Sequence, residues 1–244
     1  MEEREGFGKQ EKVYRIFEEI AGRYDNANIR ISLGMQQMLK KMLADRLVRD
    51  VDKSFASTVS PRILDLCTGT GDIAVFAARR RPGWRIIGLD FSPAMLKIAR
   101  KKGKKYGCRR IRWVKGNAMA LPYPDRTFHA VTISFGLRNC ADPGVVIREI
   151  ERVLKPGGIL LCMDSFVPGS KAVKPFYRAY FRFLMPFLGG GRTHRKEYLW
   201  LQESTEEFCS PKELAQLMQR SGMKRPAVYS RMLGACVLLE TQKA

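Results

Sequence analysis

The sequence Asp65-Leu66-Cys67-Thr68-Gly69-Thr70-Gly71-Asp72 joins a short apolar segment, residues 63–67, to a helical pattern over residues 72–80. A strand, a glycine-rich turn and a helix in this order let the backbone approach a ligand closely, and the helix start offers free N–H groups. Asp90 ends the next apolar segment, where a carboxylate accepts hydrogen bonds from both hydroxyls of a ribose. The spacing therefore predicts a site for a nucleoside-containing cofactor.

Two kinds of nucleoside fit the turn. The run from Gly69 to Ala74 matches the dinucleotide pattern G-x-G-x-x-G/A. However, Asp65 and Asp72 flank the turn, and carboxylates there repel a pyrophosphate but attract a cationic sulfonium that also carries an amino group. We therefore favour a methyl donor built on methionine, S-adenosylmethionine, over a dinucleotide, with Asp65, Gly69, Gly71 and Asp90 at its site.

Strands and helices alternate along the middle of the chain. Apolar segments at 63–67, 84–89, 111–114, 130–135 and 159–163 are separated by helical patterns, which predicts a parallel sheet with helices on both faces. Ligands bind at the carboxyl ends of such strands, so Asn117, after the third strand, and the run from Ser134 to Asn139 face the site. For Asn117, a plain turn residue is the alternative.

We expect a single domain over residues 1–244. Helical spacing over 10–50 predicts an N-terminal helical cap, and a polar connection around 50–60 leads into the cofactor-binding core at 60–165. An aromatic-rich helical lid follows at 168–208, and 209–244 predicts a helix and a closing antiparallel hairpin.

The composition bounds the class of protein. The N-terminus lacks an apolar signal segment and no long uncharged apolar run occurs, so we expect a cytoplasmic protein. The cysteines are spread singly, which predicts reduced thiols, and with only His129 and His194 we expect no metal site. The formal charge of +20 favours an anionic membrane surface or nucleic acid as a partner, unless it only keeps the protein soluble.

The chain resembles the ubiquinone/menaquinone biosynthesis C-methyltransferases, a group of class I S-adenosylmethionine-dependent methyltransferases. The run Ile133-Ser-Phe-Gly-Leu-Arg-Asn139 is the most specific match, whereas the first, second and last of the other matching stretches also occur in methyltransferases more broadly. Those other stretches are residues 17–25, 64–72, 117–125 and 152–158.

This resemblance implies a Rossmann-like class I fold, with a mostly parallel seven-stranded sheet and a C-terminal antiparallel strand. It implies C-methylation of a prenylated hydroquinone, either demethylmenaquinol or a ubiquinol precursor, with Arg138 beside the ring. It also carries cofactor contacts onto Thr70, Asp90, Asn117, Ala118 and Ser134. Departures at Met163–Phe166 and Arg195–Trp200 fall in the half that faces the substrate, so the identity of the quinone stays open.

A ring carbon becomes nucleophilic only when an adjacent hydroxyl loses its proton, so the enzyme must stabilise a phenolate. Arg138 is a candidate for this role, and a structural ion pair is its alternative. Tyr24, Asp25, Asp164 and His194 are candidates for proton handling, although His194 also reads as an exposed loop residue.

Two charged segments bear on the partners. Residues 171–187, placed on a helix, carry aromatic side chains on one face and basic ones opposite, which fits a membrane-touching helix or an ordinary lid. Basic clusters at 100–112 and 79–81 fall at the sheet edge opposite the cofactor, which makes nucleic acid less favoured. A methyltransferase for RNA or another small molecule is the runner-up, a non-catalytic nucleoside-binding module is the minor alternative, and a homodimer stays open.

Overall fold

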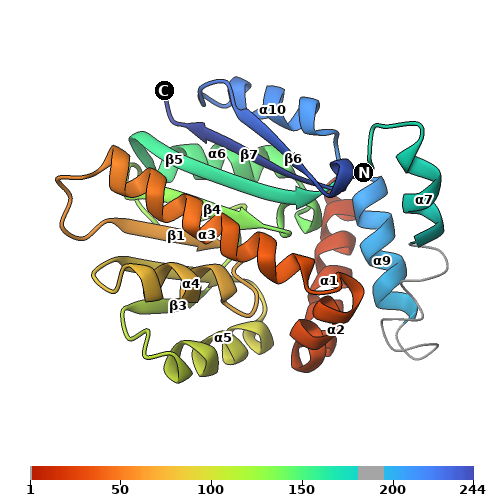
Figure 1. Ribbon diagram of the computed structural model, residues 1–244, viewed down its shortest axis with the longest axis horizontal. Coiled ribbons are helices and arrows are strands. Elements are labelled where there is room, and N and C mark those ends of the chain that lie inside the picture. Colours follow the sequence, from red (N-terminus) through yellow and green to blue (C-terminus); the bar gives the residue numbers. More distant parts are fainter. Residues whose placement is uncertain (1, 181–194) are drawn as a thin grey trace.

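The computed structural model describes residues 2–180 and 195–244 and contains one seven-stranded sheet in the order β3-β2-β1-β4-β5-β7-β6 (Figure 1). Strand β7 runs antiparallel to both of its neighbours, whereas the other neighbouring pairs are parallel, so the predicted sheet is confirmed. The strands are β1 (Arg62–Leu66), β2 (Arg85–Asp90), β3 (Ile111–Lys115), β4 (Phe128–Ser134), β5 (Leu154–Ser165), β6 (Ala227–Arg231) and β7 (Cys236–Gln242).

Helices cover both faces of the sheet because alternate strand residues point to opposite sides. Ile63 and Leu161 pack with α3 and α4, while their neighbours Leu64 and Leu160 pack with α6 and α10. The helices are α1 (Glu2–Ile20), α2 (Tyr24–Ile31), α3 (Met35–Ser54), α4 (Asp72–Arg80), α5 (Pro93–Lys105), α6 (Pro143–Val153), α7 (Val173–Ala179), α9 (Arg195–Glu206) and α10 (Pro211–Arg220). Short 3-10 turns are η1 (Ala21–Arg23), η2 (Leu137–Asn139) and η5 (Met232–Gly234).

Helix α3 extends into the segment that the sequence suggested as a polar connection. It continues to Ser54 because Leu47 and Val51, one turn apart, are both fully buried against the sheet. The stripe of buried apolar residues thus continues to Val51 although charged residues lie between its members. The connection is therefore confined to residues 55–61.

The N-terminal helices α1 and α2 lie at the end of the molecule where the parallel strands finish, beside α7 and α9 (Figure 1). The predicted lid helix over 171–187 is described only as far as residue 180, and its remaining aromatic residues fall in 181–194, outside the described residues. Among the described residues, no helix combines the length and the apolar character needed to cross a membrane.

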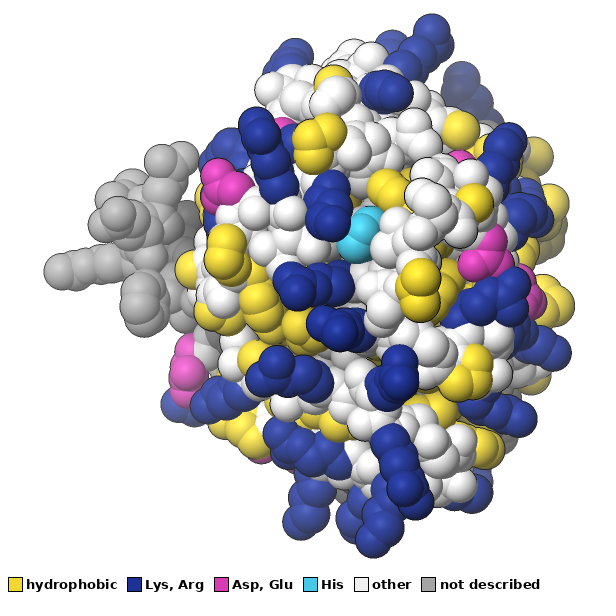
Figure 2. All heavy atoms as spheres, turned by 90° about the vertical axis from the view of Figure 1, so that its left-hand side faces the viewer, with side chains coloured by type: hydrophobic (Ala, Val, Ile, Leu, Met, Phe, Trp, Pro, Cys, Tyr) yellow, Lys and Arg dark blue, Asp and Glu magenta, His cyan; other side chains and the backbone are white. Residues whose placement is uncertain are grey.

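Basic side chains gather at the other end of the sheet. Figure 2 shows this face, on which lysine and arginine side chains predominate over acidic ones. Arg62 and Arg85, at the starts of their strands, and Arg109 and Arg110, just before β3, are exposed there. The predicted separation from the carboxyl ends of the strands therefore holds for Arg109 and Arg110, whereas Lys102 of the same cluster reaches the glycine turn and pairs with Asp25 and Asp72.

Candidate functional site

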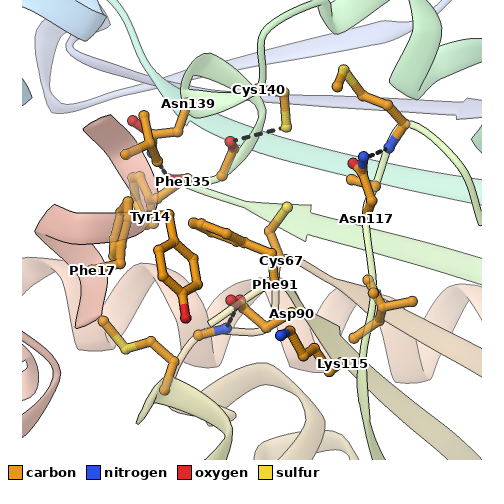
Figure 3. Close-up of a pocket in the computed structure, with 18 of the residues that line it drawn as sticks. Tyr14, Phe17, Cys67, Asp90, Phe91, Lys115, Asn117, Phe135, Asn139 and Cys140 are labelled. Atoms are coloured by element: carbon orange, nitrogen blue, oxygen red, sulfur yellow. Dashed lines mark hydrogen bonds between the residues drawn. The ribbon is translucent and has the colours of Figure 1, made fainter. Parts of the chain in front are cut away.

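A cavity of about 540 Å³ opens at the carboxyl ends of the parallel strands, and we call it the sheet-edge cavity (Figure 3). This volume lies within the range of small-molecule sites. Its walls include predicted residues that follow β1, end β2, follow β3 and end β4. These are Gly69, Asp90, Asn117, Ala118 and Ser134.

Asp90 is fixed at the floor of this cavity by backbone donors. Its Oδ2 accepts a hydrogen bond from the N–H of Gly69 at 2.7 Å, and its Oδ1 accepts one from the N–H of Ser92 at 3.0 Å. Burial raises the pKa of Asp90 above its ordinary value, in spite of these hydrogen bonds. The carboxylate is thus held rigidly with lone pairs left over, as recognition of two adjacent hydroxyls requires.

Gly69 keeps the cavity open. Its φ is +54°, a conformation that disfavours side chains, and a Cβ built there would meet no atom within 4 Å. Gly71 has a different role, because its Cβ would come within 2.5 Å of the Trp113 ring. Only the first of these two glycines lines the cavity, and the second permits the close packing of Trp113 beneath the turn.

An aromatic wall faces the polar residues. The ring of Phe91 packs against Tyr14 and Phe17 of α1, with centroid separations of 5.9 and 6.1 Å. Asn117 lies across the cavity from these rings, and its Oδ1 accepts a hydrogen bond from the N–H of Met119 at 2.9 Å (Figure 3). Asn117 is therefore both a turn residue and part of the wall, so the two alternatives given for it are compatible.

The cavity suits a nucleoside-containing group such as S-adenosylmethionine. Asp90 offers acceptors for sugar hydroxyls, and the aromatic wall offers apolar contact for a base. Ser134 Oγ is buried and has no hydrogen-bond partner within the described part of the chain. Since buried polar atoms are normally paired, this hydroxyl is a candidate for a ligand contact.

Other predicted cofactor residues lie behind the turn rather than in the cavity wall. The carboxylate of Asp65, only 2% exposed, accepts hydrogen bonds from the Thr132 hydroxyl at 2.8 Å and from the N–H of Ala74 at 3.2 Å. Burial raises the pKa of Asp65 to about 6, although these hydrogen bonds oppose the rise. Asp65 thus supports the turn from beneath, and its contact with the cofactor remains a prediction.

Asp72 belongs to a buried charge network that the sequence did not reveal. It forms ion pairs with Lys40, at 2.9 Å, and with Lys102. Burial alone would raise the pKa of Asp72, but the two ammonium groups outweigh burial and lower it to about 2. Its charge is thus compensated by two lysines, whereas Asp90 is the predicted carboxylate that lines the cavity.

The same network holds two further predicted residues. Asp25 Oδ1 accepts a hydrogen bond from Thr70 Oγ1 at 2.7 Å, and Asp25 Oδ2 pairs with Lys102 Nζ at 2.8 Å. Neither Thr70 nor Asp25 is among the described residues that line the sheet-edge cavity. These contacts fix α2 to the glycine turn, and the proton-handling role of Asp25 stays a prediction.

A second cavity of about 380 Å³, which we call the helical cavity, adjoins the first. Its walls are mostly apolar and include residues of α1, α2 and α3 and of η2, α7, α9 and η5. Both cavities share Phe17, Tyr24, Phe135 and Asn139 as wall residues. A donor in one cavity and an acceptor in the other would therefore meet at this shared wall, where Tyr24 lies.

Arg138 lines the helical cavity and also forms a buried ion pair. Its guanidinium, 5% exposed, pairs with the fully buried Asp164, and its Nη1 donates to the carbonyl of Phe135 at 2.9 Å. Its Nε is buried without a hydrogen-bond partner in residues 2–180 and 195–244. The ion pair expected as the alternative for Arg138 is thus present, and its role beside a substrate ring stays a prediction. His194 lies outside the described residues.

Sequence reasoning missed several residues of these sites. Phe91 follows Asp90 directly, and Tyr14 lies three positions before Phe17, so adjacency and helical spacing could have indicated the aromatic wall. The lysines at positions 40 and 102 gave no such signal, because their partners are distant in the sequence.

The comparisons with known proteins agree with this geometry. The ubiE/COQ5 methyltransferase family matches residues 6–243. A curated protein of Listeria welshimeri is 40% identical, covering 93% of this chain and 94% of its own, and one of Anoxybacillus flavithermus is 39% identical, covering 94% of both chains. Both relatives carry the name demethylmenaquinone methyltransferase.

Solved structures match at the level of the fold. A protein of Thermotoga maritima, described as an S-adenosylmethionine-dependent methyltransferase, has a TM-score of 0.63 at 20% identity, covering 95% of this chain and all of its own. The CurJ carbon methyltransferase has a TM-score of 0.62 at 13% identity, with 88% and 55% coverage. With the Asp90 site and the matched family, these comparisons establish that the chain belongs to the ubiE/COQ5 methyltransferase family and is an S-adenosylmethionine-dependent methyltransferase.

Proposed function

We propose that the protein methylates a ring carbon of a prenylated hydroquinone, and that its substrate is demethylmenaquinol. The adjoining helical cavity carries the proposal, because it combines apolar walls with a buried arginine beside the cofactor site. The name shared by relatives at about 40% identity supports a naphthalene ring. A benzenoid ubiquinol precursor is the second candidate for the same cavity.

The residues of the chain would act on the acceptor as follows. S-adenosylmethionine, when bound, supplies an electrophilic methyl group on a sulfonium. Arg138 would stabilise the phenolate that forms when a ring hydroxyl loses its proton, using the Nε that is free of other hydrogen bonds in the described residues. The ring carbon gains the methyl group and then loses its own proton, which restores the aromatic ring.

Tyr24 would align the two reactants. It lines both cavities, so its ring borders the path between donor and acceptor. Asp164 would act through Arg138, since its carboxylate accepts from the guanidinium and from the backbone N–H of Arg138 at 3.2 Å. Asp164 is therefore a positioning residue in this proposal rather than the base.

We also propose that the mouth of the helical cavity contacts an anionic membrane. Phe176 and Leu233 line the cavity and yet are 79% and 78% exposed, and Leu33 beside it is 73% exposed. Exposed basic residues lie close by in the chain, since Arg30 is three positions before Leu33 and Lys171 just precedes α7, which carries Phe176. Flotation with anionic vesicles tests this, because replacing Phe176 and Leu233 by Ser should reduce binding, whereas unchanged binding would contradict it.

The catalytic proposal is tested with labelled S-adenosylmethionine and a short-tailed prenylated demethylnaphthohydroquinone, kept reduced in detergent. Label should enter the hydroquinone, and the product should carry one additional ring methyl group. Bulk RNA is the parallel acceptor, since the face in Figure 2 is strongly basic. Transfer to RNA and not to the hydroquinone would replace the proposal with its runner-up.

A further inference from the structure

The helical cavity contains a line of polar residues, of which the proposed reaction so far uses only Tyr24. Tyr24, Asn28, Ser32 and Gln36 recur every fourth residue along α2 and the start of α3, and all of them line this cavity. Ile31, Met35 and Leu39 surround them with apolar surface. These polar side chains therefore lie in an otherwise apolar part of the cavity wall.

Two atoms of this line are buried without a partner. Asn28 Nδ2, a donor, and Gln36 Oε1, an acceptor, make no hydrogen bond within the residues that the structure describes. Burial of an unpaired polar atom is unfavourable, so such atoms in a cavity wall point to a ligand that pairs with them.

Ser32 links the backbones of the two residues that carry these amides. Its Oγ donates to the carbonyl oxygen of Asn28 at 2.6 Å and accepts from the backbone N–H of Gln36 at 3.2 Å. The hydroxyl thereby joins the last turn of α2 to the first turn of α3. Both amide side chains consequently project from a fixed corner, rather than from two independent helices.

We infer that Asn28 and Gln36 form hydrogen bonds with one ring hydroxyl of the methyl acceptor, the hydroxyl that is farther from Arg138. This assignment rests on the function proposed above. A hydroxyl accepts one hydrogen bond and donates another, so it satisfies an unpaired donor and an unpaired acceptor together. A quinone carbonyl only accepts, and it would leave Gln36 Oε1 unpaired. The pair thus selects the reduced ring over the oxidised one.

The positions of the groups suit a ring with oxygens on opposite sides. Arg138 lines the cavity from η2, which follows β4, whereas Asn28 lines it from α2 and Gln36 from α3. A hydroquinone between them would place one oxygen at the guanidinium and the other at the two amides. Two anchors on one ring orient the carbon that receives the methyl group.

The test combines variants of the protein with variants of the acceptor. The acceptors are a short-tailed prenylated demethylnaphthohydroquinone and its naphthol analogue, which keeps the hydroxyl next to the reacting carbon and has hydrogen in place of the distant one. The proteins are the wild type, Asn28→Leu, Gln36→Met and the double variant. Asn26→Leu serves as the matched control, since Asn26 is exposed on the same helix.

Each single variant should lower kcat/KM for the hydroquinone by about tenfold, while the naphthol rate changes less than about twofold. Asn26→Leu should leave both rates unchanged. Any intrinsic difference in ring reactivity cancels, because only the change in the hydroquinone-to-naphthol ratio between proteins is read. An equal ratio in the wild type and the double variant would overturn the assignment.

Inhibition provides an independent readout of the same assignment. For the wild type, the inhibition constant of the oxidised quinone should be larger than the dissociation constant of a hydroquinone analogue. Gln36→Met should reduce the ratio of these two constants by about tenfold. Calorimetry with S-adenosylmethionine should give wild-type affinity for every variant, which shows that each one folds. If the wild type binds S-adenosylmethionine but methylates neither acceptor, the proposed function itself fails. If the hydroquinone is methylated normally and the ratio of the two constants is the same in the variant as in the wild type, only the roles of Asn28 and Gln36 are refuted.

Discussion

The hydroxyl of Ser92 donates a hydrogen bond of 2.6 Å to the carboxylate of Glu18, which lies 74 positions earlier in the chain. The same carboxylate oxygen accepts the N–H of Ala94 at 3.0 Å. Glu18 thereby fixes α1 to the start of α5, and α1 carries Tyr14 and Phe17 of the aromatic wall. The cofactor site is thus completed by a helix that lies outside the sheet.

Replacing Glu18 by Ala should loosen this helix and weaken cofactor binding. Hydrogen bonds to a charged group contribute about 1.5–3 kcal/mol, so we expect affinity for S-adenosylmethionine to fall by about tenfold or more. Calorimetry measures the affinity, and hydrogen exchange should show faster exchange in residues 2–20. Glu19→Ala, at an exposed neighbouring position, is the control, and equal affinities in the two variants would contradict the role of Glu18.

Two glycines with similar backbone geometry should respond very differently to alanine. A Cβ at Gly71 would lie 2.5 Å from the Trp113 ring, whereas one at Gly107 would meet nothing within 4 Å, and both residues have positive φ. Gly71→Ala should therefore cost about 3 kcal/mol of unfolding free energy, against about 1 kcal/mol for Gly107→Ala. Urea denaturation measures both values, and equal losses would show that Trp113 does not constrain the turn.

Asp72→Asn should destabilise the fold in a pH-dependent way. Leaving Lys40 buried without its partner costs about 3 kcal/mol near pH 7. The pKa of Asp72 is about 2 in the folded protein, below its value of about 3.9 in an unfolded chain, so its contribution is complete above about pH 4 and is lost as the pH falls toward 2.

Denaturant unfolding of the wild type and Asp72→Asn at several pH values measures this effect. The difference between the two proteins should shrink steadily between about pH 4 and pH 2. Asp125→Asn is the control, because Asp125 is 71% exposed and its ion pair with Arg152 should contribute little at any pH. A difference that persists undiminished at pH 2 would contradict the network.

Arg138→Lys should separate catalysis from binding. Lysine keeps a positive charge near Asp164 but removes the Nε–H, so kcat for the hydroquinone should fall by about 100-fold. Affinity for S-adenosylmethionine should stay close to the wild-type value, because Arg138 lines the helical cavity and not the sheet-edge cavity. Arg148→Lys, on the exposed side of α6, is the matched control, and an unchanged kcat in Arg138→Lys would rule out the proposed role.

Local sequence patterns were sufficient for the sheet and for part of the site. The strands of the core and the closing hairpin follow from apolar runs, and Asp90 follows from its position at a strand end. These features depend on residues close together in the chain, where periodicity and turn chemistry are directly readable.

Features that depend on distant residues could not be predicted. The partners of Asp72 come from α3 and α5, and only the folded chain brings Lys40 and Lys102 to it. The same holds for the shared wall at Tyr24, which requires α2 to lie across the carboxyl ends of the strands. The end of α3 was misplaced for a related reason, since the burial of Val51 depends on the sheet and not on its charged neighbours.

The most direct test of the central claim is the quinone content of cells that normally carry this protein. Lipid extracts from cells lacking it should contain a prenylated quinone with one ring methyl group too few. The wild-type gene should restore the methylated quinone, and the Asp90→Ala variant should not, because it lacks the carboxylate that we propose binds the sugar of the cofactor. A fully methylated quinone in the cells that lack the protein would contradict the account.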